Sequence, residues 1–324
     1  MKNLSLKDLI NKGNKKKIFT PSPSFPMENI LGLSSNFTRN DLEYKKQEKR
    51  VLNKLKKISK QKKIVCMQGS GSFALEVGCL NFLRGKILVI STGYYSDRIF
   101  ELCKFAKQKF GYVKEIKKIK FSKIHEISRK YDWICACYTE TSKGFKIPLD
   151  ELKLLSKKTK SKIFLDATAS IGIEKNHKLA DVVTFSSCKS LFGLTGACFI
   201  SYSTEPKNKI SSFMLNINSH INKKMTGPNS TIQSLDFVLK KYSKFKKSVL
   251  INKELFQKQF KKYIVYSKKY QPMICTLINK KIKQSKNLII YKPRISNEGT
   301  LVFHLGEGHL EKNFGNIIKH IKIK

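Results

Sequence analysis

The fold is decided by the stretch Asp181-Val-Val-Thr-Phe-Ser-Ser-Cys-Lys-Ser-Leu-Phe-Gly-Leu-Thr-Gly196. Its apolar run over 182–185 predicts a buried strand, and a second apolar run over 197–200 follows the turn. A single lysine, Lys189, stands in that turn. A lysine beside a buried strand is readily desolvated, and its free amine can then form a Schiff base. Taken alone, this stretch favours a surface position for Lys189, as for other lysines of a lysine-rich chain.

Apolar runs that predict strands alternate with helical patterns on the N-terminal side of this stretch. The expected strands are 64–68, 86–90, 113–119, 133–138, 162–165, 182–185 and 197–200, and the expected helices are 40–63, one from 72, one up to 110, 123–130 and 149–157. This alternation predicts an α/β fold with a mostly parallel sheet. Polar residues follow the strand ends: Ser70, Tyr95, Thr141, Asp166 and Lys189. Such sheets bind ligands at this edge, so we expect a site there.

Two glycines and two serines fill the turn between the first of these strands and its helix, at residues 69–72. Backbone N–H groups at a helix N-terminus attract anions, and the hydroxyls of Ser70 and Ser72 add further donors. The turn therefore predicts a phosphate site. A serine-capped turn with no ligand is the structural alternative.

The chain has 324 residues, of which 65 are Lys or Arg and 23 are Asp or Glu, for a net charge of +42. This charge suggests a nucleic-acid-binding protein. Only six of the basic residues are arginines, and the lysines are spread along the whole sequence. We therefore favour lysines at solvated positions over a nucleic-acid interface.

No apolar run approaches the length of a membrane span, and residues 1–17 lack the apolar region of a signal peptide. We expect a cytoplasmic protein. The eight cysteines form neither a CxxC pair nor a cluster with zinc spacing, so we expect free thiols and no metal site.

From residue 230 the pattern changes to a long helical stretch. Short strands are expected over 273–278, 288–291 and 301–305, with a last helix from 310. These elements predict a small α+β domain. The expected division is an N-terminal arm over 1–18, a large domain over 19–234 and a small, shortened domain over 235–324.

Together the motifs resemble the class V pyridoxal-phosphate-dependent aminotransferases of fold type I. The likeness is greatest to the 2-aminoethylphosphonate–pyruvate and alanine–glyoxylate transaminases, and it covers residues 18–232. The matching segments are 67–76, 92–98, 138–144, 165–170, 186–193 and 225–228. Their order along the chain carries the resemblance, because each motif alone is short.

The resemblance implies pyridoxal 5'-phosphate as cofactor. Lys189 would carry it as a Schiff base and move the substrate proton. Asp166 would hold the pyridine nitrogen, Tyr95 would stack on the ring and Thr141 would meet the phenolic oxygen. The remaining cofactor-binding positions are Ser70, Gly71, Ser72, Thr168 and Thr226. In a homodimer, Thr226 would reach the cofactor of the neighbouring subunit.

Three positions depart from the family pattern. Cys188 precedes the lysine where Asn or Gln is usual, and Phe19-Thr-Pro-Ser-Pro23 lacks a glycine of the usual motif. His304 occupies the position of the substrate-binding arginine, and a histidine cannot form a bidentate fork with a carboxylate. Arg294 lies nearby in sequence and could replace that arginine.

The sequence therefore leads to an aminotransferase that moves an amino group from a small donor to a 2-oxo acid. The donor would be aminoethylphosphonate-like, alanine or serine. A lyase or desulfurase that uses the same cofactor and fold is one alternative, and a basic nucleic-acid-binding protein is the other.

Overall fold

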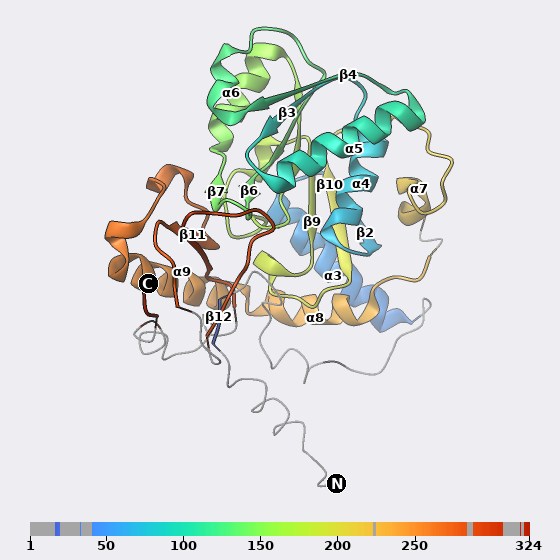
Figure 1. Ribbon diagram of the computed structural model, residues 1–324. Helices are drawn as coiled ribbons and strands as arrows, with labels where there is room; N and C mark the ends of the chain where they lie inside the picture. Colours follow the sequence, from blue (N-terminus) through green and yellow to red (C-terminus); the bar gives the residue numbers. More distant parts are fainter. Residues whose placement is uncertain are drawn as a thin grey trace.

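The computed structural model describes residues 17–19, 33, 41–222, 225–283, 288–306, 318 and 321–324. Its centre is a seven-stranded sheet of order β2-β10-β9-β8-β5-β3-β4 (Figure 1). The strands are β2 (Lys63–Gln68), β3 (Gly85–Ser91), β4 (Val113–Lys120), β5 (Trp133–Cys137), β8 (Lys162–Asp166), β9 (Val182–Ser186) and β10 (Ala197–Tyr202). Each lies within a few residues of the strand that the sequence predicts.

The sheet is mostly parallel, which confirms the expected fold class. Strands β3, β4, β5, β8 and β9 pair in parallel, whereas β10 runs antiparallel to both β9 and β2. Every residue of β5, β9 and β10 is buried. Strands buried on both faces read as continuous apolar runs, and this is the pattern that the sequence shows.

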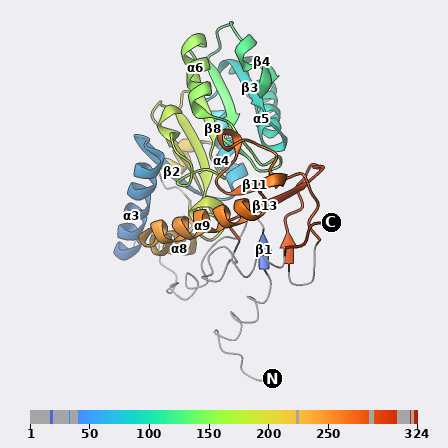
Figure 2. The ribbon, with the colours of Figure 1, turned by 90° about the vertical axis from the view of Figure 1, so that its left-hand side faces the viewer.

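Helices cover both faces of the sheet. On one face lie α4 (Gly71–Phe82) and α5 (Tyr94–Phe110), whose apolar residues join a single buried cluster. On the other face lie α3 (Leu42–Ser59), α6 (Leu149–Thr159) and α8 (Asn229–Lys240), with α3 packed against α8 (Figure 2).

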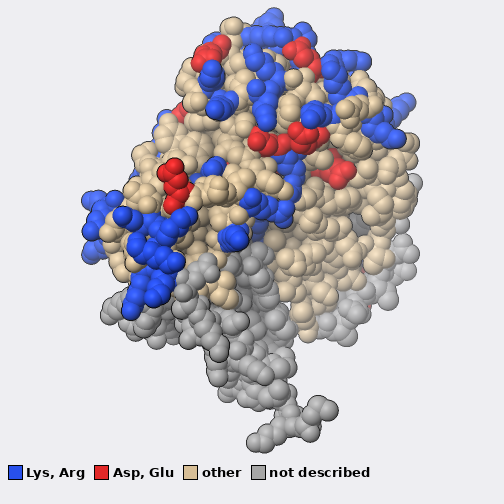
Figure 3. All heavy atoms as spheres, viewed as in Figure 1, with Lys and Arg blue, Asp and Glu red and all other residues tan. Residues whose placement is uncertain are grey.

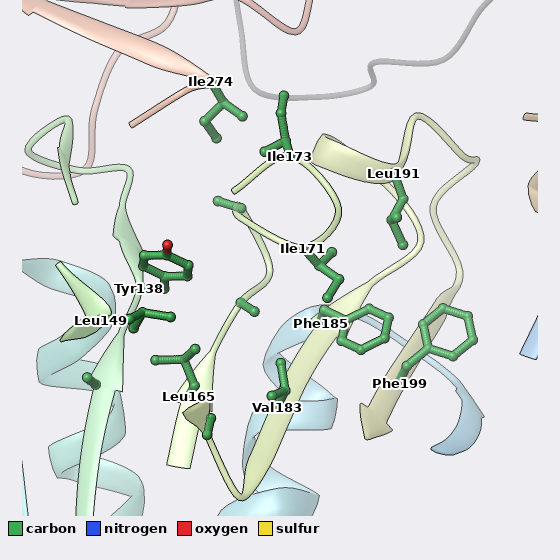
Figure 4. Close-up of a cluster of buried hydrophobic side chains, with 14 of the residues drawn as sticks. Tyr138, Leu149, Leu165, Ile171, Ile173, Val183, Phe185, Leu191, Phe199 and Ile274 are labelled. Carbon is green, nitrogen blue, oxygen red and sulfur yellow. The ribbon is translucent and has the colours of Figure 1, made fainter. Parts of the chain in front are cut away.

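The second face has the larger apolar core. Side chains of successive strands point toward one another there, among them Leu165 of β8 and Val183 and Phe185 of β9 (Figure 4). This core also includes Leu277 and Phe303 from the C-terminal region. The C-terminal elements are therefore packed onto the sheet domain at the end where the predicted site lies.

Two helices differ from the sequence prediction. The segment predicted as a helix over 123–130 is a short 3-10 helix, Phe121–Glu126. Ile124 in this helix and Ile127, which follows its last residue, are both buried and three residues apart, a spacing that suits three residues per turn. The long helix expected after 230 is broken at Lys241 into α8 and α9 (Tyr242–Gln259).

The C-terminal region contributes two small sheets. Strand β11 (Cys275–Ile278) pairs antiparallel with β13 (Thr300–Phe303). Strand β1 (Lys17–Phe19) pairs in parallel with β12 (Leu288–Ile290), so the expected boundary between residues 18 and 19 falls inside a strand. The division into arm, large domain and small domain remains a prediction. The expected helix from 310 lies almost wholly outside the described residues.

None of the helices in the described part of the chain combines the length and apolar character that a membrane crossing requires.

Lys253 on α9 makes stability depend on pH. Its side chain is buried, its Nζ donates to the carbonyl of Pro272, and burial lowers its pKa to about 8. Between pH 8 and 10.5 the unfolded chain binds more protons at this residue than the folded chain does. The contribution of Lys253 to the free energy of unfolding therefore rises with pH across this window, by about 3 kcal/mol. Below pH 8 the full cost of burying the charged lysine is present.

We expect Lys253→Met to remove this dependence. The free energy of unfolding of the wild type relative to the variant should rise by about 3 kcal/mol between pH 7 and 10.5, measured by urea denaturation. Lys258→Met, at an exposed position on the same helix, is the matched control and should show no such change. Parallel pH profiles for the wild type and Lys253→Met would contradict the assignment.

Candidate active site

A cavity of about 270 Å³ lies beyond the carboxyl ends of the central parallel strands. Nine of the residues singled out in the sequence line it: Ser70, Gly71, Ser72, Tyr95, Thr141, Asp166, Thr168, Lys189 and Arg294. Other lining residues include Arg98, Cys137, Thr139 and Cys188. The structure thus gathers into one place side chains that are more than 200 positions apart in the sequence.

The N-terminus of α4 forms one wall of this cavity. Ser70 caps the helix, and its Oγ accepts a hydrogen bond of 3.3 Å from the N–H of Phe73. A Cβ atom added to Gly71 would lie 2.9 Å from side-chain atoms of Thr168. Glycine therefore allows the first turn of α4 to approach the end of β8 closely. Such a helix end suits a phosphate group.

Asp166 is the last residue of β8, in the middle of the sheet. Its register partners are Cys137 on β5 and Thr184 on β9. One carboxylate oxygen accepts the N–H of Thr168 at 2.9 Å, and the side chain is buried beside the cavity. A carboxylate in this position suits a positively charged ring nitrogen.

Lys189 lies in the turn between β9 and β10, with its backbone in the left-handed region at φ 54°. This conformation costs roughly 1–2 kcal/mol for a residue other than glycine, so the surrounding contacts must impose it. The Oγ of Ser187 donates to the carbonyl of Leu194 at 2.6 Å, and the hydroxyl of Tyr242 donates to that of Ser190 at 2.9 Å. The Lys189 Nζ lies 5.3 Å from the centre of the Tyr95 ring.

Glu140 is a residue whose role the sequence did not reveal. It is fully buried, and its carboxylate accepts hydrogen bonds from the backbone N–H groups of Tyr95 (3.1 Å), Ser96 (3.0 Å) and Ser142 (3.2 Å) and from the Ser142 hydroxyl. It thereby caps α5, whose own N-cap residue, Gly93, has no side chain to offer. This links Tyr95 to the turn that carries Thr141.

Thr139 also escaped the sequence analysis. It lines the cavity, and its buried Oγ1 has no hydrogen-bond partner among the described residues. A buried hydroxyl without a partner is costly unless a ligand satisfies it. The chemistry of the lining residues fits pyridoxal phosphate: a helix N-terminus for the phosphate, an aromatic ring, hydroxyls, a carboxylate and an amine.

The structure does not bring His304, the residue at the position of the expected substrate-binding arginine, into the lining of the Lys189 cavity. It is fully buried, with Nε2 2.9 Å from the Oγ1 of Thr276 and its ring packed 5.3 Å from that of Phe256. It does not line the cavity. Its place directly after β13 and its apolar surroundings draw it into the core, which the local sequence pattern could not show.

Thr226 lies at a different place from the other predicted cofactor residues. It is exposed and lines a separate hollow of about 500 Å³ together with Tyr44, Gln68 and Met214. A third hollow of about 970 Å³ shares residues with it, among them Lys45 and Glu48. Both are larger than the Lys189 cavity, but neither contains Lys189 or Asp166.

No family model matches the chain. Its sequence is 26% identical over 207 residues to a bifunctional phosphonoacetaldehyde hydrolase/aminoethylphosphonate transaminase of Clostridioides difficile, a match that covers 59% of this chain and 32% of the relative. It is 26% identical over 146 residues to a 2-aminoethylphosphonate–pyruvate transaminase of Pseudomonas aeruginosa, covering 42% and 39%. The matched region thus spans about a third to two fifths of these curated relatives.

Solved structures match nearly the whole chain. An alanine–glyoxylate aminotransferase from Nostoc sp. has a TM-score of 0.77 at 14% identity, covering 93% of this chain and 92% of its own. A pyridoxamine–pyruvate aminotransferase from Mesorhizobium loti has a TM-score of 0.76 at 16% identity, covering 93% and 89%. The expected α/β aminotransferase fold is confirmed, and with the sequence relatives so is the resemblance to the class V group.

We expect Glu140→Ala to destabilise the protein by about 3 kcal/mol, because it leaves several buried donors without an acceptor. Urea denaturation measures the loss. Glu101→Ala, which removes an exposed carboxylate from α5, the helix that Glu140 caps, should change stability by no more than about 0.5 kcal/mol. Equal effects of the two substitutions would contradict the capping role of Glu140.

Proposed function

We propose that this chain is a pyridoxal-phosphate-dependent aminotransferase that moves an amino group from a small amino donor to a 2-oxo acid. The donor is aminoethylphosphonate-like, alanine or serine. The observation that carries the proposal is the convergence of Lys189, Asp166 and the N-terminus of α4 on one cavity. Each of these groups could have a purely structural role by itself. Structural roles do not explain why all three face the same cavity.

The lining residues would hold the cofactor at three points. The first turn of α4 and the hydroxyls of Ser70 and Ser72 would bind the phosphate. Tyr95 would stack on the ring. Asp166 would keep the ring nitrogen protonated, because an opposite charge favours the charged form. Thr141 and Thr168 lie where they can donate further hydrogen bonds, and so does Thr139, which the sequence did not single out.

Bound in this way, the cofactor supplies an electron sink for the charge that develops on the substrate carbon. The Lys189 amine would anchor the cofactor covalently and, once released, take the proton from the carbon that bears the amino group. The donor leaves as a carbonyl compound and the 2-oxo acid leaves as an amino acid. The two half-reactions balance without an external oxidant.

The alternatives have weaker support. A desulfurase commonly needs a mobile-loop cysteine and a ring-stacking histidine, whereas under the present proposal Tyr95 would take the stacking position. A nucleic-acid interface would concentrate basic groups. On the face drawn in Figure 3, lysines and arginines lie both at the top of the molecule and at the left over the C-terminal region, with a few acidic groups between them.

The proposal includes a cytoplasmic homodimer. Thr226 is exposed, far along the chain from the phosphate site, and would contact the cofactor of the partner subunit. Large apolar side chains are exposed in the same region, at Phe213, Met214 and Ile221. Met214 lines the Thr226 hollow and Ile221 lines the adjoining one, so a partner subunit would cover them.

Cofactor attachment tests the proposed function directly. The purified protein, mixed with pyridoxal phosphate and reduced with borohydride, should carry the label at Lys189 in peptide mass mapping. Lys189→Ala should abolish the label, and Lys178→Ala, at an exposed lysine, should keep it. Absence of a reducible adduct in the wild type would refute the function.

The dimer has its own test. Phe213→Asp together with Ile221→Asp should convert the protein to a monomer in light scattering and weaken cofactor binding. Thr226→Ala should leave the dimer intact and lower cofactor affinity about tenfold, the value of one hydrogen bond to a charged group. A wild-type monomer with full cofactor affinity would rule out the shared site.

A further inference from the structure

Two arginines from distant parts of the chain meet at the mouth of the Lys189 cavity. Arg98 belongs to the first turns of α5, and Arg294 belongs to the segment between β12 and β13. Both line the cavity. The hydroxyl oxygen of Tyr94 accepts a hydrogen bond from Arg98 Nη2 at 3.4 Å and another from Arg294 Nη1 at 3.0 Å.

The two guanidinium groups share a neutral partner. Each lies over the Tyr94 ring, Arg98 at 5.4 Å and Arg294 at 5.3 Å from its centre. Within the described part of the chain, no carboxylate forms an ion pair with either arginine. The carboxylate of Glu140, beside the start of α5, accepts the backbone N–H groups of Tyr95 and Ser96.

Two like charges so close together repel each other, and a neutral phenol compensates them only in part. An anion placed between them would receive charge-assisted hydrogen bonds from both guanidinium forks. The hydrogen bonds from Arg98 and then Arg294 already lower the pKa of Tyr94, which shows that this oxygen experiences both positive charges.

The segment that carries Arg294 is fixed to the sheet domain. The side chain of Asn297 donates to the carbonyl of Ser142 at 3.0 Å, and the Nζ of Lys143 donates to that of Ser296 at 3.3 Å. Tyr291, three residues before Arg294, forms a hydrogen bond with Tyr95. Burial, together with this bond, raises the pKa of Tyr291. Arg294 is therefore held in place beside the turn that carries Thr141.

We propose that Arg98 and Arg294 bind an oxyanion at the far end of the amino donor, and that Tyr94 is the residue that positions Arg294 for this contact. The inference rests on the proposed aminotransferase function and narrows its donor to an amine with an anionic tail. It also gives the chain a substitute for the arginine that His304, buried in the core, does not provide.

Amino donors that share a two-carbon spacer and differ only in the terminal group test whether the protein recognises that group. 2-Aminoethylphosphonate, 2-aminoethylsulfonate, β-alanine and n-propylamine all place the amine two carbons from the terminal group. Conversion of the bound cofactor, followed by absorbance in single turnovers, gives kcat/KM for each. We expect the doubly charged phosphonate to react fastest and propylamine to react at least a hundredfold more slowly.

Single substitutions test whether Arg294 and Tyr94 cause the preference for a donor with an anionic tail. Arg294→Gln should lower kcat/KM for the phosphonate about 10- to 100-fold, as expected for a charge-assisted hydrogen bond, and leave propylamine unchanged. Tyr94→Phe should raise KM several-fold and leave kcat unchanged, because both charges remain but Arg294 loses its anchor. Lys292→Gln removes a positive charge from the same segment and should change neither constant more than twofold.

Binding provides a readout that is independent of catalysis. Calorimetry with methylphosphonate should show binding to the wild type and to Lys292→Gln, and binding at least tenfold weaker to Arg294→Gln. Methylphosphonate should also raise the pKa of Tyr94, seen as the difference in tyrosinate absorbance between the wild type and Tyr94→Phe.

The outcomes separate the two proposals. Equal reactivity of propylamine and the phosphonate, with a label at Lys189, overturns the anion site and leaves the aminotransferase function standing. Absence of any label at Lys189 overturns the function, and methylphosphonate binding then decides the anion site alone. Equal effects of Arg294→Gln and Lys292→Gln would show a general charge effect and would refute the assigned site.

Discussion

The register of the parallel strands β5, β8 and β9 determines where the polar groups of the cavity lie. Asp166 pairs with Cys137 on one side and with Thr184 on the other, at the last position of β8. A slip by one residue would turn its carboxylate to the opposite face of the sheet. The apolar residues of these strands are buried on both faces, so such a slip would also exchange the side chains that pack in the two cores. The packing that stabilises the fold thus also fixes the position of Asp166.

The first turns of two helices also lie in close contact with residues that follow the strands. The first turn of α4 approaches Thr168 because residue 71 is a glycine, and the first turn of α5 is held by the carboxylate of Glu140. Both helices therefore point their positive ends at the cavity. The two helix ends alone make the cavity attractive to anions. The positive charges of Arg98 and Lys189 strengthen this attraction.

The sequence allowed the sheet and most of the cavity to be predicted, because buried strands that end in polar residues leave a local pattern. Lys189, Asp166 and Ser70 each stand directly after such a strand. The position of His304 was inferred from local similarity alone, and its burial against Phe256 and its contact with Thr276 depend on tertiary packing. The capping role of Glu140 escaped notice because its partners on α5 are about 45 residues away, and that of Tyr94 because Arg294 is 200 residues away.

The Tyr94 contact links the two parts of the chain at the point where a donor would enter. Arg294 is exposed, and a few hydrogen bonds that join its segment to Ser142, Lys143 and Tyr94 determine its position. Each such bond contributes only about 1 kcal/mol, so this part of the mouth is held weakly compared with the sheet. Under the proposed assignment, an oxyanion that contacts both arginines would add interactions across the same boundary. A donor with an anionic tail would thus strengthen the contact between the two parts of the chain, and a donor without one would not.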